Sequence, residues 1–281
     1  MVNIMRMDLY RLVHSKALWV FLAIIVALAA ISTGTVAYVS SPTFTESLEA
    51  AEGLHVGFSD AKSTAEAGAA LGSLVQNLSA ESLVGSSLLS GGALACLFAI
   101  FVAIFLTAEF EGGFAKNVLS AQPNRLALLA ARSVEIAVLA VAFTAVSIGA
   151  TLAIAAVAGL ELAPTPPTDL ALWAALVALS VAAFGMLTAL GAWATRKMAA
   201  SIVIGVVLAS GVVTAMLKGV LALFPSAPHI ADYTPYSCTA SLALGLDAAG
   251  TLDPLHIALV TTAFIVIGIG LGAVALQKRD V

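Results

Sequence analysis

Six long apolar stretches, all free of acidic residues, constrain the fold of this 281-residue chain more than any other feature. Each stretch is at least as long as the ~20 residues that a helix needs to cross the hydrocarbon core of a bilayer. They cover residues 17–39, 84–108, 136–160, 170–195, 198–224 and 255–276. Backbone groups that face lipid must be satisfied within the protein, so each stretch is predicted to be a membrane-spanning helix.

The composition excludes a water-soluble fold. Apolar residues make up 61% of the chain and charged residues only 10%, whereas a soluble domain carries about 25% charged residues to cover its surface. We therefore predict an all-α polytopic membrane protein that forms one domain over residues 1–281. No basic face indicates nucleic-acid binding. The two cysteines, Cys96 and Cys238, cannot build a disulfide framework, and they are expected not to pair with each other.

The basic residues fix the orientation of the helices. Ten of the twelve lie on one side of the predicted spans: Arg6, Arg11, Lys16, Lys116, Arg125, Arg132, Arg196, Lys197, Lys278 and Arg279. The other side holds Lys62 and Lys218 together with most of the acids. Because cytoplasmic segments carry the excess of Lys and Arg, both termini are predicted to be cytoplasmic.

The segment before the first span, residues 1–16, is predicted to be an amphipathic helix in the cytoplasmic interface. Six of its apolar residues fall within one arc of about 120° at helical spacing: Met1, Val2, Met5, Leu9, Leu12 and Val13. A cleaved signal peptide ending near Ala37 is the alternative. The apolar run of the first span is longer than the ~7–15 residues of a signal-peptide core, which favours a retained helix.

Two segments on the external side allow more than one interpretation. The long loop 40–83 carries six acids that either attract a cationic substrate or form the solvated face of a small cap: Glu46, Glu49, Glu52, Asp60, Glu66 and Glu81. The apolar run 237–246 is too short to cross a bilayer. We expect it to lie at the external interface or to dip in and return, where it would line an exit path or seal the external end of the bundle.

The cytoplasmic loop 109–135 carries the most distinctive motif. Span two ends in the acids Glu109 and Glu111, and the pair Gly112-Gly113 permits a sharp turn. A short helix over 114–119 would follow, ended by Pro123. From the residues alone this is either a contact helix for a cytoplasmic partner or a tight solvated turn.

This loop resembles the first cytoplasmic loop of type-two ATP-binding-cassette (ABC) exporter permeases. The shared pattern is acid, aromatic, any residue, glycine and a small residue, then a basic residue, Leu, Pro and Arg. The chain layout is similar as well: an amphipathic N-terminal helix, a sizeable external loop, six spans and a short basic tail. The small-subunit permeases of bacitracin-resistance and lantibiotic-immunity exporters are the nearest group. Their loop usually has Gly-Thr where this chain has Gly112-Gly113, which removes a hydroxyl that caps a helix.

The resemblance implies that the loop is a coupling helix which contacts a separate ABC ATPase subunit. The implied contact residues are Glu109, Phe110, Glu111, Gly112, Gly113, Phe114, Lys116 and Asn117. ATP and magnesium would bind that partner, and a second permease, either an identical copy or a paralogue, would complete the assembly in a bacterial cell membrane. The exported cargo would be a peptide or an amphipathic drug.

No motif for covalent chemistry or cofactor binding is found. The chain lacks the Gly-x4-Gly-Lys-Ser/Thr phosphate loop and the His-Glu-x-x-His zinc motif, so no catalytic, cofactor or metal residues are predicted. One alternative function is a motor-independent secondary transporter or channel, which would need an ion site within the membrane. Another is an intramembrane enzyme or a structural envelope partner; the enzyme would need Ser, Glu or His side chains converging at one depth.

Two further expectations concern packing. Arg132 and Glu135, three residues apart at the cytoplasmic end of span three, are expected to form a pair on the helix surface. Gly268 and Gly272 form a Gly-x3-Gly face in span six. That face allows close approach of another helix, either within the subunit or at a dimer seam.

Overall fold

The computed structural model describes most of the chain. The residues outside its description are 1–6, 8–9, 42–43, 45–77, 112–124, 224–227, 247, 249 and 279–281. The described residues form helices and contain no β-strand; one isolated β-bridge joins Ser79 to Ala163. The all-helical prediction is therefore confirmed for the part of the chain that the structure describes.

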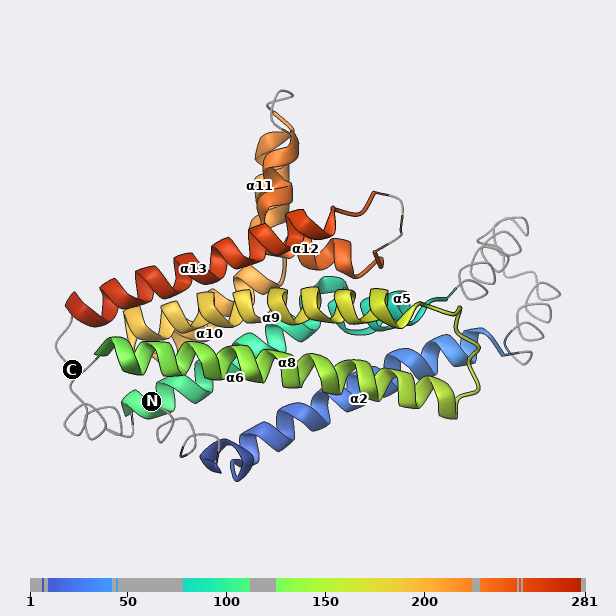
Figure 1. Ribbon diagram of the computed structural model, residues 1–281, viewed down its shortest axis with the longest axis horizontal. Coiled ribbons are helices and arrows are strands. Elements are labelled where there is room, and N and C mark those ends of the chain that lie inside the picture. Colours follow the sequence, from blue (N-terminus) through green and yellow to red (C-terminus); the bar gives the residue numbers. More distant parts are fainter. Residues whose placement is uncertain are drawn as a thin grey trace, which may run out of the picture.

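The long helices run roughly along the long axis of the molecule, except α11 (Val212–Leu221), which projects from the bundle (Figure 1). They are α2 (Lys16–Val39), α6 (Ala93–Glu111), α8 (Arg125–Val157), α9 (Pro167–Thr195), α10 (Met198–Ala209), α11 (Val212–Leu221) and α13 (Pro254–Lys278). Shorter pieces are α5 (Ala80–Val84), the π-helical η1 (Gly85–Leu89), the 3-10 segments η2 (Ser90–Gly92) and η3 (Pro228–Tyr233), and α12 (Pro235–Leu242). Five described helical segments are long and apolar enough to cross a membrane, and α10 with α11 makes a sixth if counted as one bent span.

Apolar side chains cover the outside of the bundle as well as its interior. Ile31 in α2 is 67% exposed, Val141 in α8 59% and Val266 in α13 61%. A water-soluble protein rarely presents contiguous apolar surface of this kind, because burying it is the main driving force of folding. Lipid is the solvent that suits such a surface, so the chain is a multi-pass membrane protein.

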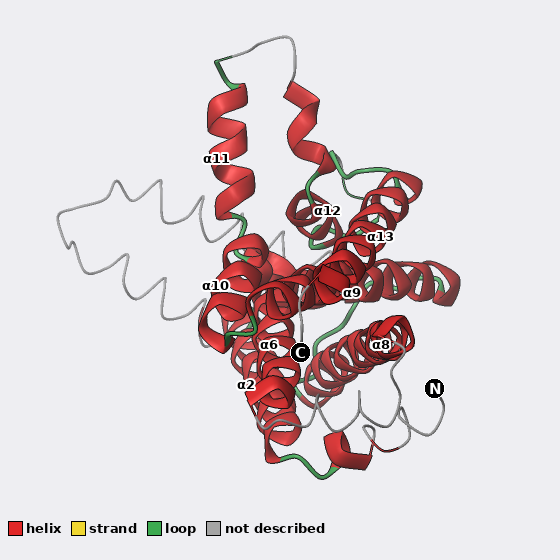
Figure 2. Cartoon of the chain, turned by 90° about the vertical axis from the view of Figure 1, so that its left-hand side faces the viewer, coloured by secondary structure: helices red, strands yellow, loops and turns green. Residues whose placement is uncertain are grey.

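Helix α9 lies at the centre of the bundle, where it packs against α6, α8, α10 and α13 (Figure 2). Glycines on α13 allow close packing against α9: a Cβ at Gly272 would come within 2.5 Å of the Trp193 ring, and one at Gly268 within 3.2 Å of Met186 Cβ. The Gly-x3-Gly face thus packs against a helix of the same chain. The sequence had left open whether this face packs within the subunit or at a dimer seam, and the structure shows packing within the subunit.

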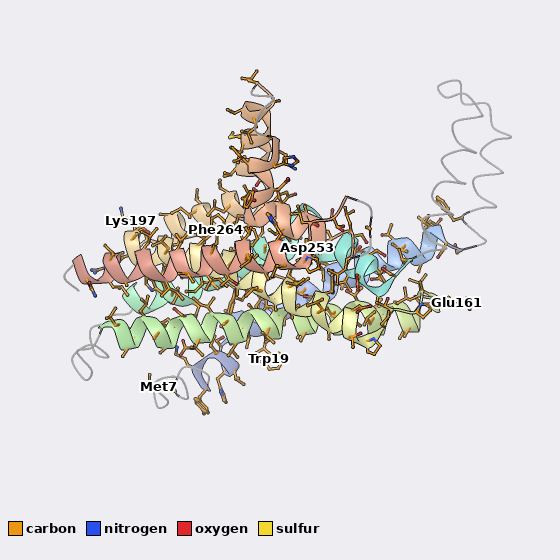
Figure 3. The ribbon with its side chains drawn as sticks, turned by 45° about the horizontal axis from the view of Figure 1, so that its top comes forward. Met7, Trp19, Glu161, Lys197, Asp253 and Phe264 are labelled. Atoms are coloured by element: carbon orange, nitrogen blue, oxygen red, sulfur yellow. The ribbon has the colours of Figure 1, made fainter. Side chains whose placement is uncertain are left out.

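The N-terminal segment meets the bundle through a sharp turn. Tyr10–Val13 are helical, and the chain then turns so that Ser15 caps α2 by accepting a hydrogen bond from the Leu18 N–H at 3.3 Å. The indole of Trp19 donates to the Val13 carbonyl at 2.8 Å and holds the turn. Lys197 lies at one end of the bundle and Glu161 at the opposite end (Figure 3). The positive-inside rule would place the end that bears Lys197 on the cytoplasmic side, and this orientation stays a prediction.

Three of the predicted spans differ from the structure. Span three was expected to begin at residue 136, but α8 already begins at Arg125, so the predicted loop 109–135 is helical in its last eleven residues. Span two, expected over 84–108, is interrupted by η1 and η2, and span five, expected over 198–224, breaks between α10 and α11 with a 51° bend. Spans one, four and six correspond to α2, α9 and α13 within three residues at each end.

Candidate functional site: two broken helices that meet at Tyr236

The coupling residues predicted from the sequence lie at and beyond the end of α6. The backbone of Glu109, Phe110 and Glu111 forms the last turn of that helix. Gly112, Gly113, Phe114, Lys116 and Asn117 fall outside the described residues. The contact with an ATPase subunit therefore stays a prediction, and the described residues direct attention to another part of the bundle.

The first helix break lies at Ser90-Gly91-Gly92, between η1 and α6. Gly91 and Gly92 have φ values of +68° and +73°, in the left-handed region that glycine adopts without strain. Gly92 is also in close contact with α10, because a Cβ there would lie 1.9 Å from the Ala209 carbonyl oxygen. Glycine is thus required at position 92 for two reasons, its backbone conformation and the approach of a neighbouring backbone.

The second break lies at Ser210-Gly211, between α10 and α11. Gly211 has a φ of +78°, and a Cβ at this position would lie 2.4 Å from Cζ of Tyr236. The same tyrosine ring is 3.5 Å from the Cβ position of Gly92. One aromatic side chain from α12 therefore packs on both breaks, and it fills the space that the two glycines leave.

Helix α12 is held in place by side-chain hydrogen bonds from distant elements. The Leu246 N–H, just after α12, donates to the Glu81 carboxylate of α5 at 3.0 Å, and the indole N–H of Trp173 in α9 donates to the Leu242 carbonyl at 2.8 Å. The backbones are close as well, since a Cβ at Gly85 would lie 2.1 Å from the Ala243 carbonyl oxygen. These bonds fix the helix that carries Tyr236.

Glu81 corrects an interpretation of the external loop. The sequence left open whether the acids of this loop attract cations or form a solvated face. The Glu81 side chain is only 5% exposed, and its carboxylate accepts a hydrogen bond from the Leu246 N–H, just after α12. A buried carboxylate needs such hydrogen bonds because desolvation of the charged form is otherwise costly. The other five acids of the loop lie outside the described residues.

Hydroxyl groups join the base of α11 to the segment that precedes α12. The Thr214 hydroxyl donates to that of Thr234 at 3.0 Å, and the Ser237 hydroxyl donates to the Ala231 carbonyl at 2.8 Å. Thr234 also caps α12 by accepting from the Ser237 N–H. The polar base contrasts with the rest of α11, where Met216 is 69% exposed, so α11 is anchored at its start and projects from the bundle (Figures 1 and 2).

An ion pair lies inside the bundle, near the N-terminal end of α8. Arg132 and Glu135 are 2% and 6% exposed, and their nearest atoms are 2.5 Å apart. The prediction of a surface pair is wrong, because α8 starts earlier than expected and turns both residues toward the interior. The Arg132 guanidinium lies 5.6 Å from the centre of the Phe105 ring, a distance that allows a cation–π contact.

Among the described residues, no three His, Cys, Asp or Glu side chains are grouped to hold a metal ion. Both cysteines are free, as expected. Burial raises the pKa of the Cys238 thiol in α12 to about 12, so that thiol stays protonated and unreactive at neutral pH. The site contains irregular backbone within two apolar spans, and neighbouring protein buries it at Gly92 and Gly211. Gly91 is exposed.

Sequence reasoning missed both breaks, although the signals were present. Ser-Gly-Gly and Ser-Gly are turn signals. Glycine is also frequent in unbroken membrane helices, so these sequences did not stand out as breaks. Tyr236 stands in no local pattern that distinguishes it from an ordinary interfacial aromatic residue. No protein-family model and no curated protein matches this chain. The fold and the site define a multi-pass helical membrane protein that is compatible with a component of a transporter.

Proposed function

We propose that this chain is the membrane-spanning permease subunit of a bacterial ABC exporter, driven by a separate ATP-binding subunit. The observation that carries the proposal is the meeting of two broken spans at Tyr236. In membrane transporters, discontinuous helices are typical of binding sites and gates, because they can change angle without unfolding. A static scaffold has no use for two such breaks in contact. The loop pattern that follows Glu109 supports an ABC motor in particular.

The helices provide a path from that loop to the breaks. Helix α6 runs from the first break at Gly92 directly into the loop that begins at residue 112. Helix α10 packs along α6 and α9 and ends at the second break. ATP-driven closure of the partner displaces the loop, α6 transmits the displacement, and the segments beyond Gly92 and Gly211 change angle around the Tyr236 ring. This rigid-body switch would open an external path for a peptide or an amphipathic drug.

The proposal is tested first by co-purification. The chain is tagged at its C-terminus, extracted in mild detergent from cells that express its genomic neighbours, and analysed for an ATP-binding subunit in stoichiometric amount. Substitution of residues 113–116 should abolish that association. A clean homo-oligomer under these conditions would contradict the proposal and favour a transporter that works without a motor.

Charge reversal then tests coupling. Glu111→Lys and Lys116→Glu should leave membrane insertion intact but separate ATP hydrolysis from export in reconstituted vesicles. Lys197→Glu is the matched control, because Lys197 is an exposed cation at the same end of the bundle but outside the loop. Normal export by both loop variants would refute the assignment of the loop.

One observation favours a second candidate function, ion-coupled transport. Glu135 is a buried acid within α8, a kind of residue that often marks an ion pathway. Its pairing with Arg132 favours a structural role. Uptake or efflux by the isolated chain in liposomes without ATP, lost in Glu135→Gln, would establish the ion-coupled function instead.

A further inference from the structure

The first helix break is exposed on one side. Ser86, Ser90 and Gly91 are exposed there, whereas Gly92 is buried against α10. Ser86 and Ser90 are four residues apart, about one turn of the π-helical segment η1, so they lie on the same side of the chain. A Cβ at Gly91 would meet no neighbouring heavy atom within 4 Å, so the space beside the break is open.

The Ser90 hydroxyl lacks the hydrogen bond that serines in apolar helices usually make. The Ser86 hydroxyl donates to the Leu83 carbonyl at 3.0 Å. The Ser87 hydroxyl donates to the Val84 carbonyl at 2.9 Å. Such a bond to the preceding turn satisfies a hydroxyl even beside lipid. Ser90 makes no side-chain hydrogen bond within the part of the chain that the structure describes. An unpaired hydroxyl is costly in hydrocarbon, whereas water satisfies it.

The break lies within the thickness of a bilayer. Helix α10 begins directly after Lys197, and a charged side chain belongs at or beyond the edge of the hydrocarbon core. The 12 residues of α10 span about 18 Å. They end at Ala209, whose carbonyl oxygen meets Gly92, so the two breaks share one level. Because the hydrocarbon core is ~30 Å thick, that level lies inside it.

We propose that Ser86, Ser90 and Gly91 line a water-filled recess within the membrane. Non-helical backbone at this depth is tolerated only where protein buries it or where it borders water, and Gly91 is exposed. The unpaired Ser90 hydroxyl favours water for the same reason. In the proposed exporter, this recess is the part of the transport path that polar groups of the cargo enter. Only that last assignment rests on the proposed function.

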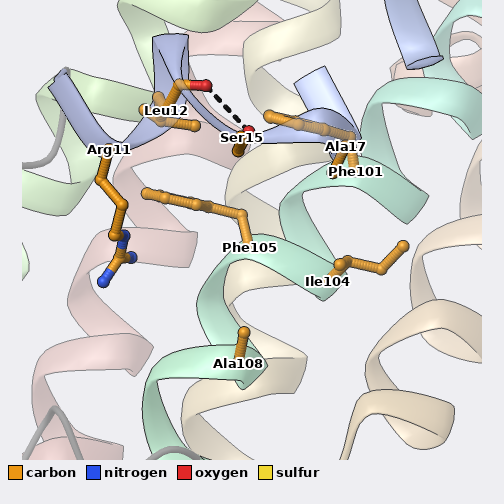
Figure 4. Close-up of a pocket in the computed structure, with 8 residues that line it drawn as sticks. All are labelled: Arg11, Leu12, Ser15, Ala17, Phe101, Ile104, Phe105 and Ala108. Atoms are coloured by element: carbon orange, nitrogen blue, oxygen red, sulfur yellow. Dashed lines mark hydrogen bonds between the residues drawn. The ribbon is translucent and has the colours of Figure 1, made fainter. Parts of the chain in front are cut away.

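A second opening beside α6 is of a different kind. A cavity of about 310 Å³ lies between residues 11–17 and the C-terminal half of α6, as Figure 4 shows. The α6 side of this cavity is apolar and is formed by Phe101, Ile104, Phe105 and Ala108. Ordered water needs polar partners, which this wall does not supply. The first break is therefore the place where an opening coincides with polar groups and non-helical backbone.

Water accessibility is measured by cysteine labelling of the full-length chain in reconstituted vesicles. A charged thiol reagent that does not cross lipid is supplied on both sides of the bilayer. Cys96→Ala removes the half-buried native thiol, and Cys238 is buried. In this background, Ser86→Cys and Ser90→Cys should react at least about tenfold faster than Ile31→Cys. The reason is that a thiol needs contact with water to ionise to the reactive thiolate.

Ile31→Cys is the matched control for exposure and depth. Ile31 is 67% exposed, lies in the continuous helix α2 and is about 22 Å along that helix from Lys16. Slow labelling of the buried Cys238 in each variant shows that the variant is folded.

Two results would overturn the proposal. If Ser90→Cys reacted as slowly as Ile31→Cys, the break would be covered, and cross-linking of Ser90→Cys between two copies would then identify a second chain as the cover. If Ile31→Cys reacted as fast as Ser90→Cys, the labelling would not distinguish a recess from the membrane surface, and the recess would be refuted.

The co-purification experiment keeps this inference separate from the proposed function. An ATP-binding subunit together with an unreactive Ser90→Cys would support the exporter and remove the recess. A reactive Ser90→Cys in a chain without such a subunit would support the recess and remove the motor.

Discussion

The contact between Tyr236 and Gly211 makes a quantitative prediction. In Gly211→Ala, the new Cβ would lie 2.4 Å from the Tyr236 ring, and the backbone would have to keep a φ of +78°. The left-handed conformation costs a residue with a Cβ about 1–2 kcal/mol. Overpacking against the partly buried Tyr236 ring adds about 1–3 kcal/mol. We therefore expect the variant to lose about 2–5 kcal/mol of stability.

Removal of the ring should separate these two contributions. Tyr236→Ala destabilises the protein by itself, because it leaves a cavity. In the double variant with Gly211→Ala, the overpacking disappears and only the backbone strain remains. The combined loss should be smaller than the sum of the single losses by about 1–3 kcal/mol, the size of the relieved clash.

Gly92 provides the contrasting case. A Cβ at this position meets the Ala209 carbonyl oxygen at 1.9 Å, and a backbone atom cannot rotate out of the way. Tyr236→Ala should therefore give no comparable relief to Gly92→Ala. Gly219→Ala is the matched control: Gly219 lies in α11 with no neighbour near its Cβ position, so alanine should stabilise the helix by up to about 1 kcal/mol.

The assay is thermal and denaturant unfolding of the purified chain in detergent, followed by fluorescence of its three tryptophans. Gly219→Ala should be the most stable of the three proteins, the wild type should come next, and Gly211→Ala should be the least stable. If Gly211→Ala were as stable as the Gly219 control, the packing of Tyr236 on the break would be refuted. Equal relief of Gly92→Ala and Gly211→Ala by Tyr236→Ala would refute the distinction between ring and backbone contacts.

Three further predictions concern buried polar groups. Glu81→Ala should cost about 1–3 kcal/mol because the Leu246 N–H loses its acceptor, whereas Glu81→Gln keeps an acceptor and should cost less; both are measured as unfolding midpoints. Arg132→Met should cost about 3–5 kcal/mol by leaving the Glu135 charge buried, and adding Glu135→Leu should restore most of that loss in the same assay. Alkylation of Cys238 at pH 8 should be on the order of a thousandfold slower than that of an unfolded thiol, and its rate should rise with pH until the thiol ionises near its raised pKa of about 12.

The spans themselves were largely predictable because the membrane leaves few alternatives. A stretch of ~20 apolar residues has to be helical to satisfy its backbone. Helices α2, α9 and α13 accordingly begin and end close to the limits of the apolar runs. Helix α8 was predicted too short, since Arg125 and Arg132 were assigned to the loop. That assignment failed because Arg132 is buried inside the bundle, where Glu135 on the same helix pairs with it and the Phe105 ring of α6 lies beside it.

The breaks were not predictable from hydropathy, because they do not change it. Span two remains apolar on both sides of Ser90-Gly91-Gly92, and span five does so around Ser210-Gly211. Glycine is acceptable in the middle of a membrane helix, so its presence alone does not distinguish a break from a close helix contact. Gly272 and Gly211 illustrate the ambiguity: the first lies in a continuous helix beside Trp193, and the second ends one at φ +78°.

The residues that hold the candidate site share no local pattern, because each is defined by a partner far away in the sequence. Glu81 binds the backbone of Leu246, 165 residues further on, and Trp173 binds that of Leu242, 69 residues further on. In both pairs the acceptor or donor on α12 is a backbone group, which any amino acid would supply. Only the folded chain shows that these bonds fix the helix carrying Tyr236. Variants that move α12 should therefore disturb the breaks at Gly92 and Gly211 even when they lie outside both spans.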